Sequence, residues 1–205
     1  MGFDIYGLQP LVNTAKPTIL DKDWLELTDK QRDKYNEANN QYEDENPGIY
    51  FRNNNWWWRP LWGYIVENCE GILSKKEIES GGFNDGSEIP AYKVDEIVDV
   101  LEKLIEKKQH IIYEEKYKKD QSKLAKEKCT CCEGIGAISN KGEIAVEIIQ
   151  DALNSKIKDK TLMKECHVCN GTGERENWGK SYPFDAENLE NFVKFLGQSG
   201  GIRIC

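Results

Sequence analysis

Short segments in which polar and apolar residues alternate predict β-strands at both ends of the chain. The first twelve residues begin Met-Gly-Phe-Asp-Ile-Tyr-Gly-Leu, and their apolar residues alternate with polar or small ones as in a half-buried strand. Residues 49–52 read Ile-Tyr-Phe-Arg and residues 202–205 read Ile-Arg-Ile-Cys, and both segments also predict short strands. We expect these three strands to pair into one small sheet.

Four other segments have the residue spacing of helices. Residues 21–46 are polar, and Thr28 with Gln31 forms a capping box that would start a solvated helix. Pro60 favours the first turn of a helix that continues to Cys69. From Val94 the apolar residues recur at intervals of three and four through Ile112, which predicts one long helix extending toward the cysteine-rich region. Asp185 is placed to cap a last helix, which carries Leu189, Phe192, Val193 and Leu196.

These elements together predict an α+β fold, with helices packed on a small sheet. We assign residues 1–125 and 177–205 to this core. Residues 126–176 are assigned to a knuckle subdomain, in which residues 144–153 have helical periodicity and connect two cysteine motifs.

Composition narrows the class of protein. The 205-residue chain has 28 basic and 36 acidic residues, a formal net charge of −8. General nucleic-acid binding relies on Lys and Arg to neutralise phosphates, so this charge argues against it. No apolar run approaches the length of a membrane span, and we see no hydrophobic leader. Seven cysteines in such a chain favour a reducing compartment where thiols bind metal. We therefore expect a cytoplasmic protein without a membrane partner.

Two copies of the motif C-x-x-C-x-G-x-G stand 37 positions apart, at residues 129–136 and 166–173. Four thiolates grouped two and two can close a tetrahedral zinc site, and glycines let the chain curl so that backbone N–H groups face the sulfurs. A structural zinc fills all four positions with protein ligands, whereas a catalytic zinc needs an open one. Cys131 and His167 are spare donors beside the site. The predicted ligands of one structural Zn²⁺ are Cys129, Cys132, Cys166 and Cys169.

The motif pair resembles the cysteine-rich region of the DnaJ co-chaperones and the single knuckle of the anti-TRAP regulatory protein. The resemblance covers residues 129–136 and 166–173. DnaJ proteins have four repeats and two zinc ions, so two repeats imply one zinc. The His-Pro-Asp tripeptide of the DnaJ helical domain is absent from the sequence. Co-chaperone activity is therefore not implied.

An aromatic and basic cluster between residues 51 and 62 is the main candidate for ligand recognition. Adjacent tryptophans project in different directions, so at least one ring should be exposed or line a cavity. Indole faces stack on bases, arginine binds phosphate, and asparagine amides read base edges. The cluster could instead form a large core or a protein interface. The candidate ligand-binding residues are Arg52, Asn53, Asn54, Trp56, Trp57, Trp58, Arg59 and Trp62.

Three segments look like parts of small proteins from bacteriophages and their hosts. They are the opening Met-Gly-Phe-Asp-Ile-Tyr-Gly, residues 48–62 with their Trp-Trp-Trp-Arg-Pro-Leu-Trp, and the ending Ser-Gly-Gly-Ile-Arg-Ile-Cys. The resemblance implies an accessory product of a phage type, and some such products sequester nucleotide immune signals of the host. It supplies no catalytic residue.

The sequence thus predicts a non-enzymatic anti-defence protein that captures a small anionic, nucleotide-derived ligand. The alternative is a regulator that docks a host protein through its zinc knuckle. A nucleotide hydrolase is a third hypothesis, with Asp4, Asp85 and Glu88 as an acid group, but isolated carboxylates are usually solvated or paired. The sequence leaves open whether the chain forms a homo-oligomer, and whether a pocket lies within one chain or between chains.

Overall fold

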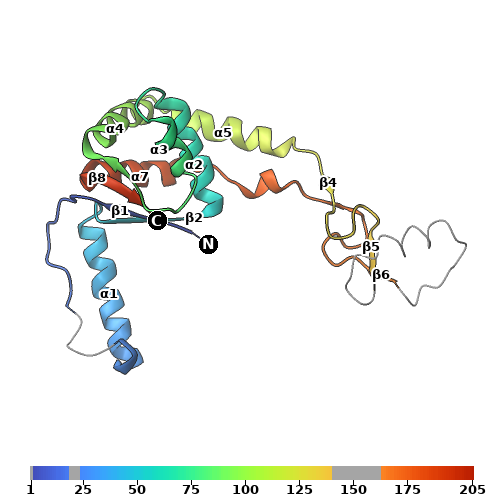
Figure 1. Cartoon of the computed structure of the whole chain (residues 1–205), viewed down its shortest axis with the longest axis horizontal. Helices are drawn as coiled ribbons and strands as arrows, with labels where there is room; N and C mark the ends of the chain where they lie inside the picture. Colours follow the sequence, from blue (N-terminus) through green and yellow to red (C-terminus); the bar gives the residue numbers. More distant parts are fainter. Residues whose placement is uncertain (1, 19–23, 140–162) are drawn as a thin grey trace, which may run out of the picture. The chain divides into compact units, whose positions relative to one another are not determined.

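Four short strands form one antiparallel sheet in the computed structural model, which describes residues 2–18, 24–139 and 163–205. They are β1 (Gly2–Gly7), β2 (Tyr50–Asn54), β3 (Ser87–Pro90) and β8 (Gly201–Ile204), in the order β2-β1-β8-β3. The strands expected at both chain ends and near residue 50 therefore pair as predicted, and the α+β fold class is confirmed (Figure 1).

Helices pack on one face of this sheet. The principal ones are α2 (Asn55–Asn68), α4 (Ala91–Glu106) and α7 (Ala186–Ser199), and each contacts at least one strand (Figure 1). Their apolar residues and those of the inner sheet face form one buried cluster that includes Ile5, Trp58, Leu101 and Phe192. The chain divides into two compact units, Met1–Lys118 with Tyr182–Cys205, called the body here, and Lys119–Ser181, called the knuckle unit.

Three further helices complete the described part of the chain. Helix α1 (Asp29–Glu45) buries none of its residues and begins at the predicted capping box, where the Thr28 N–H donates to the Gln31 side chain at 3.0 Å. Helix α3 (Lys75–Ser80) is short, and α5 (Gln109–Ser122) follows α4. Two 3₁₀ turns, η1 (Trp24–Glu26) and η2 (Trp178–Ser181), lie in the loops.

Two helix predictions need correction. Pro60 does not start α2: the helix begins at Asn55 because the Asn54 side chain accepts the N–H groups of Trp56 and Trp57, both at 3.0 Å. The long helix expected from Val94 is two helices, because Lys108 adopts a φ of +56° that interrupts the chain between α4 and α5. The predicted connector at 144–153 lies outside the described residues.

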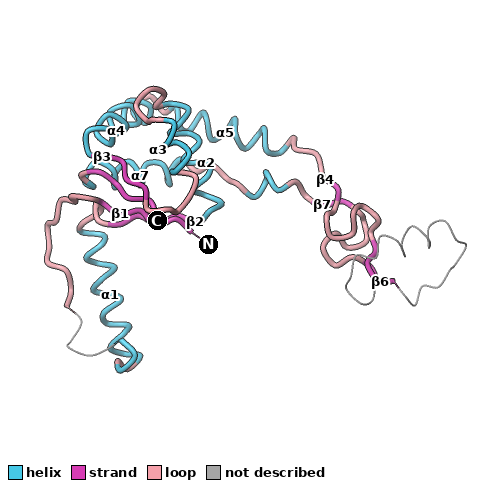
Figure 2. Tube along the Cα trace, in the orientation of Figure 1, coloured by secondary structure: helices cyan, strands magenta, loops and turns pink. Residues whose placement is uncertain are grey.

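Four very short strands organise the part of the knuckle unit that the structure describes. Strand β4 (Glu127–Lys128) pairs with β7 (Glu174–Arg175), and β5 (Ala137–Ser139) pairs with β6 (Met163–Glu165) (Figure 2). The strand entering each cysteine motif thus pairs with the strand leaving the other. Ladders of two and three residue pairs provide few hydrogen bonds, so this unit depends on another source of stability.

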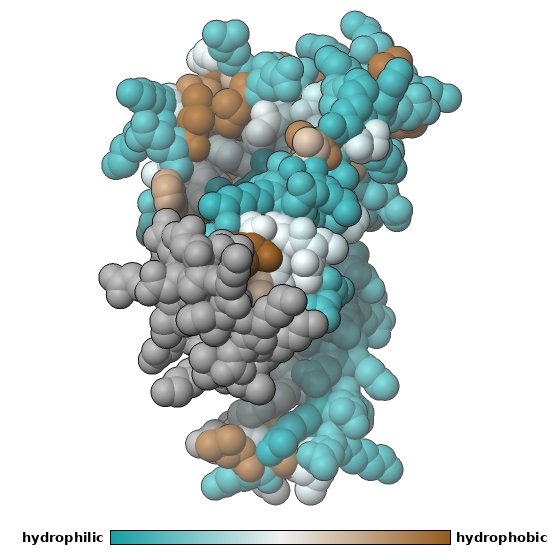
Figure 3. Space-filling view, turned by 90° about the vertical axis from the view of Figure 1, so that its right-hand side faces the viewer, coloured by the Kyte–Doolittle hydropathy of each residue, from teal (hydrophilic) through white to brown (hydrophobic). Residues whose placement is uncertain are grey.

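The described surface is mainly hydrophilic on the face drawn in Figure 3, with small separate hydrophobic patches. None of the helices in the described ranges is both long and apolar enough to cross a bilayer.

The start of α7 provides a first testable prediction. The Asp185 carboxylate accepts the Asn188 N–H at 2.7 Å, as the sequence indicated, and Phe184 and Leu189 are both buried beside this cap. Asp185→Ala is expected to lower the free energy of unfolding of the body by about 1 kcal/mol, because a helix N–H loses its acceptor. Urea unfolding followed by circular dichroism measures the change. The exposed Lys194→Ala in the same helix is the control, and an equal loss in both variants would contradict a specific capping role.

Candidate metal centre

The four predicted ligands come together in the knuckle unit. The sulfurs of Cys129, Cys132, Cys166 and Cys169 all lie within 4.8 Å of one another, and all four residues are buried. The Cys129–Cys166 and Cys132–Cys169 sulfur distances are 3.9 and 3.6 Å. Four thiolates at zinc bond lengths stand about 3.8 Å apart in a tetrahedron, so the spacing fits such an ion. A four-cysteine set of this kind could bind a metal ion.

The two motifs fold into matching loops. In the first loop the Gly136 N–H points at the Cys132 sulfur at 3.2 Å, and in the second the Gly173 N–H points at the Cys169 sulfur at 3.3 Å. Such N–H groups stabilise thiolate charge and orient the ligands. Each loop also bonds to the other: the Cys129 N–H donates to the Gly173 carbonyl at 2.8 Å, and the Cys166 N–H to the Gly136 carbonyl at 2.9 Å.

Glycine is required where the loops cross. Gly136 and Gly173 have φ values of +80° and +78°, which L side chains rarely adopt. A Cβ atom on Gly136 would lie 2.2 Å from the Gly171 carbonyl oxygen, and one on Gly173 would lie 2.3 Å from that of Gly134. The glycines of the motif therefore allow the two loops to approach until their thiols form one cluster.

Two of the four clustered cysteines differ in the pKa of their free thiols. Burial opposes ionisation of Cys166, but N–H groups of Cys169 and Val168 outweigh it and hold its pKa below the usual range. Burial raises the pKa of Cys169 to about 11. A bound cation would displace these protons, so binding at this cluster releases protons and weakens at low pH.

The two spare donors beside the site, Cys131 and His167, differ in their contact with the cysteine cluster. Cys131 packs against the cluster, and a hydrogen bond to Cys166, followed by burial, raises the pKa of its thiol. His167 is exposed. All seven cysteines are free thiols, and Cys69 lies in the core of the body, where burial raises its pKa to about 11. An inert thiol is typical of such a position.

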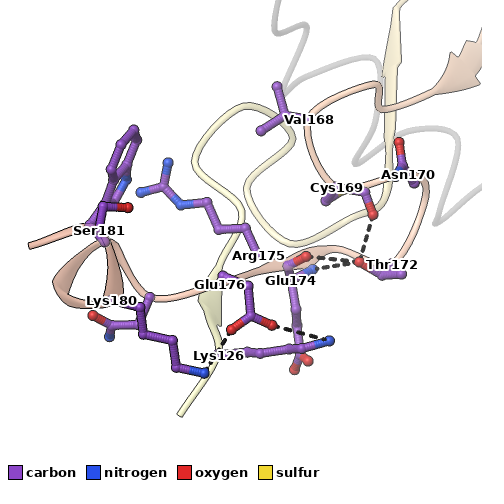
Figure 4. Close-up of a pocket in the computed structure, with 12 residues that line it drawn as sticks. Lys126, Val168, Cys169, Asn170, Thr172, Glu174, Arg175, Glu176, Lys180 and Ser181 are labelled. Atoms are coloured by element: carbon purple, nitrogen blue, oxygen red, sulfur yellow. Dashed lines mark hydrogen bonds and ion pairs between the residues drawn. The ribbon is translucent and has the colours of Figure 1, made fainter. Parts of the chain in front are cut away.

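An open hollow of about 620 Å³ lies beside the second loop. Cys169, Asn170 and Thr172 of that loop form part of its wall, so the metal ligands and the hollow share a segment (Figure 4). The Thr172 hydroxyl donates to the Cys169 carbonyl at 2.7 Å. A metal ion that fixed the shape of this loop would therefore also fix the shape of the hollow.

Charged and aromatic side chains complete the hollow. The Arg175 guanidinium lies 4.8 Å from the Trp178 ring centroid and pairs with Glu127 at 2.8 Å. Glu176 lies between Lys126 and Lys180, at 3.9 and 2.7 Å, and the hydrogen bond from Lys180 lowers the pKa of Glu176 (Figure 4). This surface was not predicted from the sequence, although the charged run Glu-Arg-Glu-Asn-Trp directly after the second motif was a usable signal.

The structure distributes the eight candidate ligand-binding residues among different environments. Trp58 and Trp62 are buried in the body core, where their indole N–H groups donate to the carbonyls of Gly81 and Ile78 at 2.7 and 3.0 Å. Trp57 is half-buried, and Trp56 is 37% exposed and packs on Tyr182. All four indoles are thus at least partly occupied with packing.

The polar members of that set also have local roles. The buried Asn53 side chain donates to Asn188 at 3.1 Å, Asn54 caps α2, and Arg59 donates to Asn55 at 2.8 Å. Arg52 is exposed on the sheet. The eight residues therefore do not share one surface.

The three acids of the hydrolase hypothesis lie on or next to strands β1 and β3 of the sheet. Asp4 contacts Arg52, Glu88 pairs with Arg203 at 2.5 Å, and Asp85 accepts the Ser87 N–H at 3.0 Å. Each carboxylate thus has a local partner, as expected for structural acids.

Comparisons of the chain with protein-family models, with curated proteins and with solved structures give no match.

Proposed function

We propose that this chain is a non-enzymatic binding protein whose knuckle unit, held by one zinc ion on four cysteines, docks a protein partner. The observation that carries this proposal is the shared second loop, because the segment that supplies two ligands also forms the wall of an open hollow. A closed set of four thiolates has no position for a substrate, so the metal acts through structure.

The hollow has the features of a docking surface. Val168 is 45% exposed and Trp178 is 51% exposed, which gives an apolar contact area, and the lysine and glutamate side chains provide a polar rim. Tryptophan and arginine contribute disproportionately to protein interfaces. The resemblance to small phage proteins suggests a host protein as the partner, and anti-TRAP is a precedent for a knuckle protein that acts by binding.

Affinity capture from bacterial lysate followed by cross-linking tests this function. We expect one partner in equimolar amount, cross-linked to Lys126 or Lys180. Trp178→Ala should weaken its capture by at least about tenfold, because a hot-spot residue contributes roughly 2 kcal/mol or more. The control is Tyr92→Ala, which removes an exposed ring in the body. A partner that still binds both Trp178→Ala and Cys129→Ser would contradict docking at the hollow.

A second candidate function is capture of a small anionic, nucleotide-derived ligand, which would remove an immune signal from the host. Arg52 favours it, because this member of the predicted ligand set is exposed on the sheet near a pair of tyrosines, Tyr6 and Tyr50. Calorimetric titration with nucleotides tests this function. If none of the nucleotides binds, this candidate function is wrong.

A further inference from the structure

One face of the sheet of the body carries polar and aromatic side chains that are exposed or only half-buried. Side chains alternate along each strand, and the inner set, including Phe3, Ile5, Ile89 and Ile202, is buried in the core. The opposite set faces outward in register: Asp4 is opposite Arg52, Tyr6 is opposite both Tyr50 and Arg203, and Glu88 is opposite Arg203. We call these six residues, Asp4, Tyr6, Tyr50, Arg52, Glu88 and Arg203, the outer sheet face.

Two tyrosines form an aromatic platform on this face. The rings of Tyr6 and Tyr50 have centroids 5.3 Å apart with an interplanar angle of 40°, and Tyr6 is 44% exposed. The Tyr50 hydroxyl donates to Asp4, which fixes the ring. Burial, followed by that hydrogen bond, raises the pKa of Tyr50, so this ring stays neutral. An exposed ring held beside a fixed one offers an aromatic face for stacking without a large ordering cost.

Two arginines flank the platform on neighbouring strands. Arg203 donates to Glu88 through Nε and Nη2 at 2.9 and 2.5 Å, and Arg52 lies with its Nε 3.6 Å from Asp4. Each guanidinium group thus has a carboxylate partner on the neighbouring strand. Their side chains nevertheless remain 51% and 69% exposed, so much of each planar fork faces solvent and can meet a phosphate.

We propose that the outer sheet face binds a small nucleotide, with its base stacked on Tyr6 and Tyr50 and its phosphate on Arg203 or Arg52. This inference rests on the second candidate function and relocates its site from the indoles to the sheet. Aromatic side chains on four-stranded antiparallel sheets stack bases in RNA-binding modules, so the chemistry has precedent. Only one or two bases fit on two rings.

A nucleic-acid strand is a poorer occupant than a free nucleotide. The chain carries a net charge of −8, and Asp4 and Glu88 lie among the arginines. A strand brings many phosphates past these carboxylates, whereas a small ligand needs to place only one or two against the arginines. Mononucleotides and cyclic dinucleotides are therefore the expected ligands, and single-stranded oligonucleotides serve as the comparison.

Isothermal titration calorimetry of the full chain with these three probes tests the site. Tyr6→Ala should weaken nucleotide affinity by about 5- to 150-fold, because it removes a stacking ring. Tyr6→Phe keeps the ring and should bind nearly as the wild type does. Arg203→Gln should also weaken binding. Tyr92→Ala alters an exposed ring elsewhere in the body and should have no effect.

Each other outcome has a definite meaning. Unchanged thermal unfolding of Tyr6→Ala excludes general damage as the cause of weaker binding. If the wild type binds nucleotide and neither Tyr6→Ala nor Arg203→Gln weakens it, the sheet site is wrong while ligand capture stands. If no nucleotide binds at millimolar concentration, both are wrong. Tighter binding of oligonucleotides than of mononucleotides would overturn the small-ligand assignment.

Discussion

Cys129→Ser is expected to abolish zinc binding and to unfold the described parts of the knuckle unit while the body remains folded. The buried cluster of this unit, as far as it is described, contains four cysteine ligands and only one other hydrophobic residue, Ile138. Burying one isoleucine contributes about 1.5–3 kcal/mol, far less than the backbone entropy lost on ordering several loops. A structural zinc contributes about 10–16 kcal/mol at neutral pH and can supply the difference.

Metal analysis and hydrogen exchange measure this effect. The wild type should contain about one zinc per chain and Cys129→Ser nearly none. Amide protection should fall across 127–139 and 163–175, as it should after chelation of the wild type, and should persist in the strands of the body. Acidification should have the same effect as chelation, because protons compete with the metal for the thiolates.

Cys131→Ser is the matched control, since this thiol lies in the same loop and contacts the cluster. It should retain zinc and protection. Retention of zinc by Cys129→Ser together with loss from Cys131→Ser would show that Cys131 is a ligand and that the assigned set is wrong.

The cysteine cluster could be predicted from the sequence because its geometry is local. Each C-x-x-C-x-G-x-G motif brings its two thiols and its N–H donors together within eight residues. Only the association of the two loops involves distant residues, and the 37-residue repeat already indicated equivalent halves. The adjoining hollow was missed because its wall combines both sides of the unit, from Lys126 to Lys180.

In the body, the sequence predicted the strands and caps more successfully than the short elements between them. Helix α3 had a usable signal, a capping box in which the Glu77 carboxylate accepts the Ser74 N–H at 2.7 Å. Strand β3 had almost none, because four residues ending in Pro90 form a strand only through pairing with β8. The outer sheet face could not be predicted for the same reason: Tyr6, Tyr50 and Arg203 meet only through strand register.

The sequence could not decide which tryptophans of the cluster are buried, because the phase of a helix depends on where it begins. With α2 starting at Asn55, residues 58, 61, 62 and 65 form one stripe that faces the core, while residues 56, 59 and 63 are exposed. With the predicted start at Pro60, residues 56–58 would lie outside the helix, and this buried stripe could not be recognised from the sequence. The indoles that looked available for ligand stacking therefore include two that hold the body together.

Trp58→Ala is expected to destabilise the body by about 3–5 kcal/mol, the range for removing a fully buried aromatic side chain. Trp58 is inaccessible to solvent, and its ring lies 5.2 Å from that of Phe3, 5.6 Å from Trp62 and 5.6 Å from Phe192. The substitution leaves a cavity between sheet and helices and removes the indole donor of the Gly81 carbonyl. Urea unfolding followed by far-UV circular dichroism measures the loss.

Trp56→Ala is the matched control, because it removes an indole ring from the exposed side of the same helix, α2. Trp56 packs on Tyr182 with a centroid distance of 4.9 Å but is 37% exposed, so the expected loss is below about 1.5 kcal/mol. Equal losses in the two variants would show that the assigned phase of α2 is wrong. Loss of nucleotide affinity in a fully stable Trp58→Ala variant would instead return the ligand site to the indoles, and would exclude the outer sheet face as its main determinant.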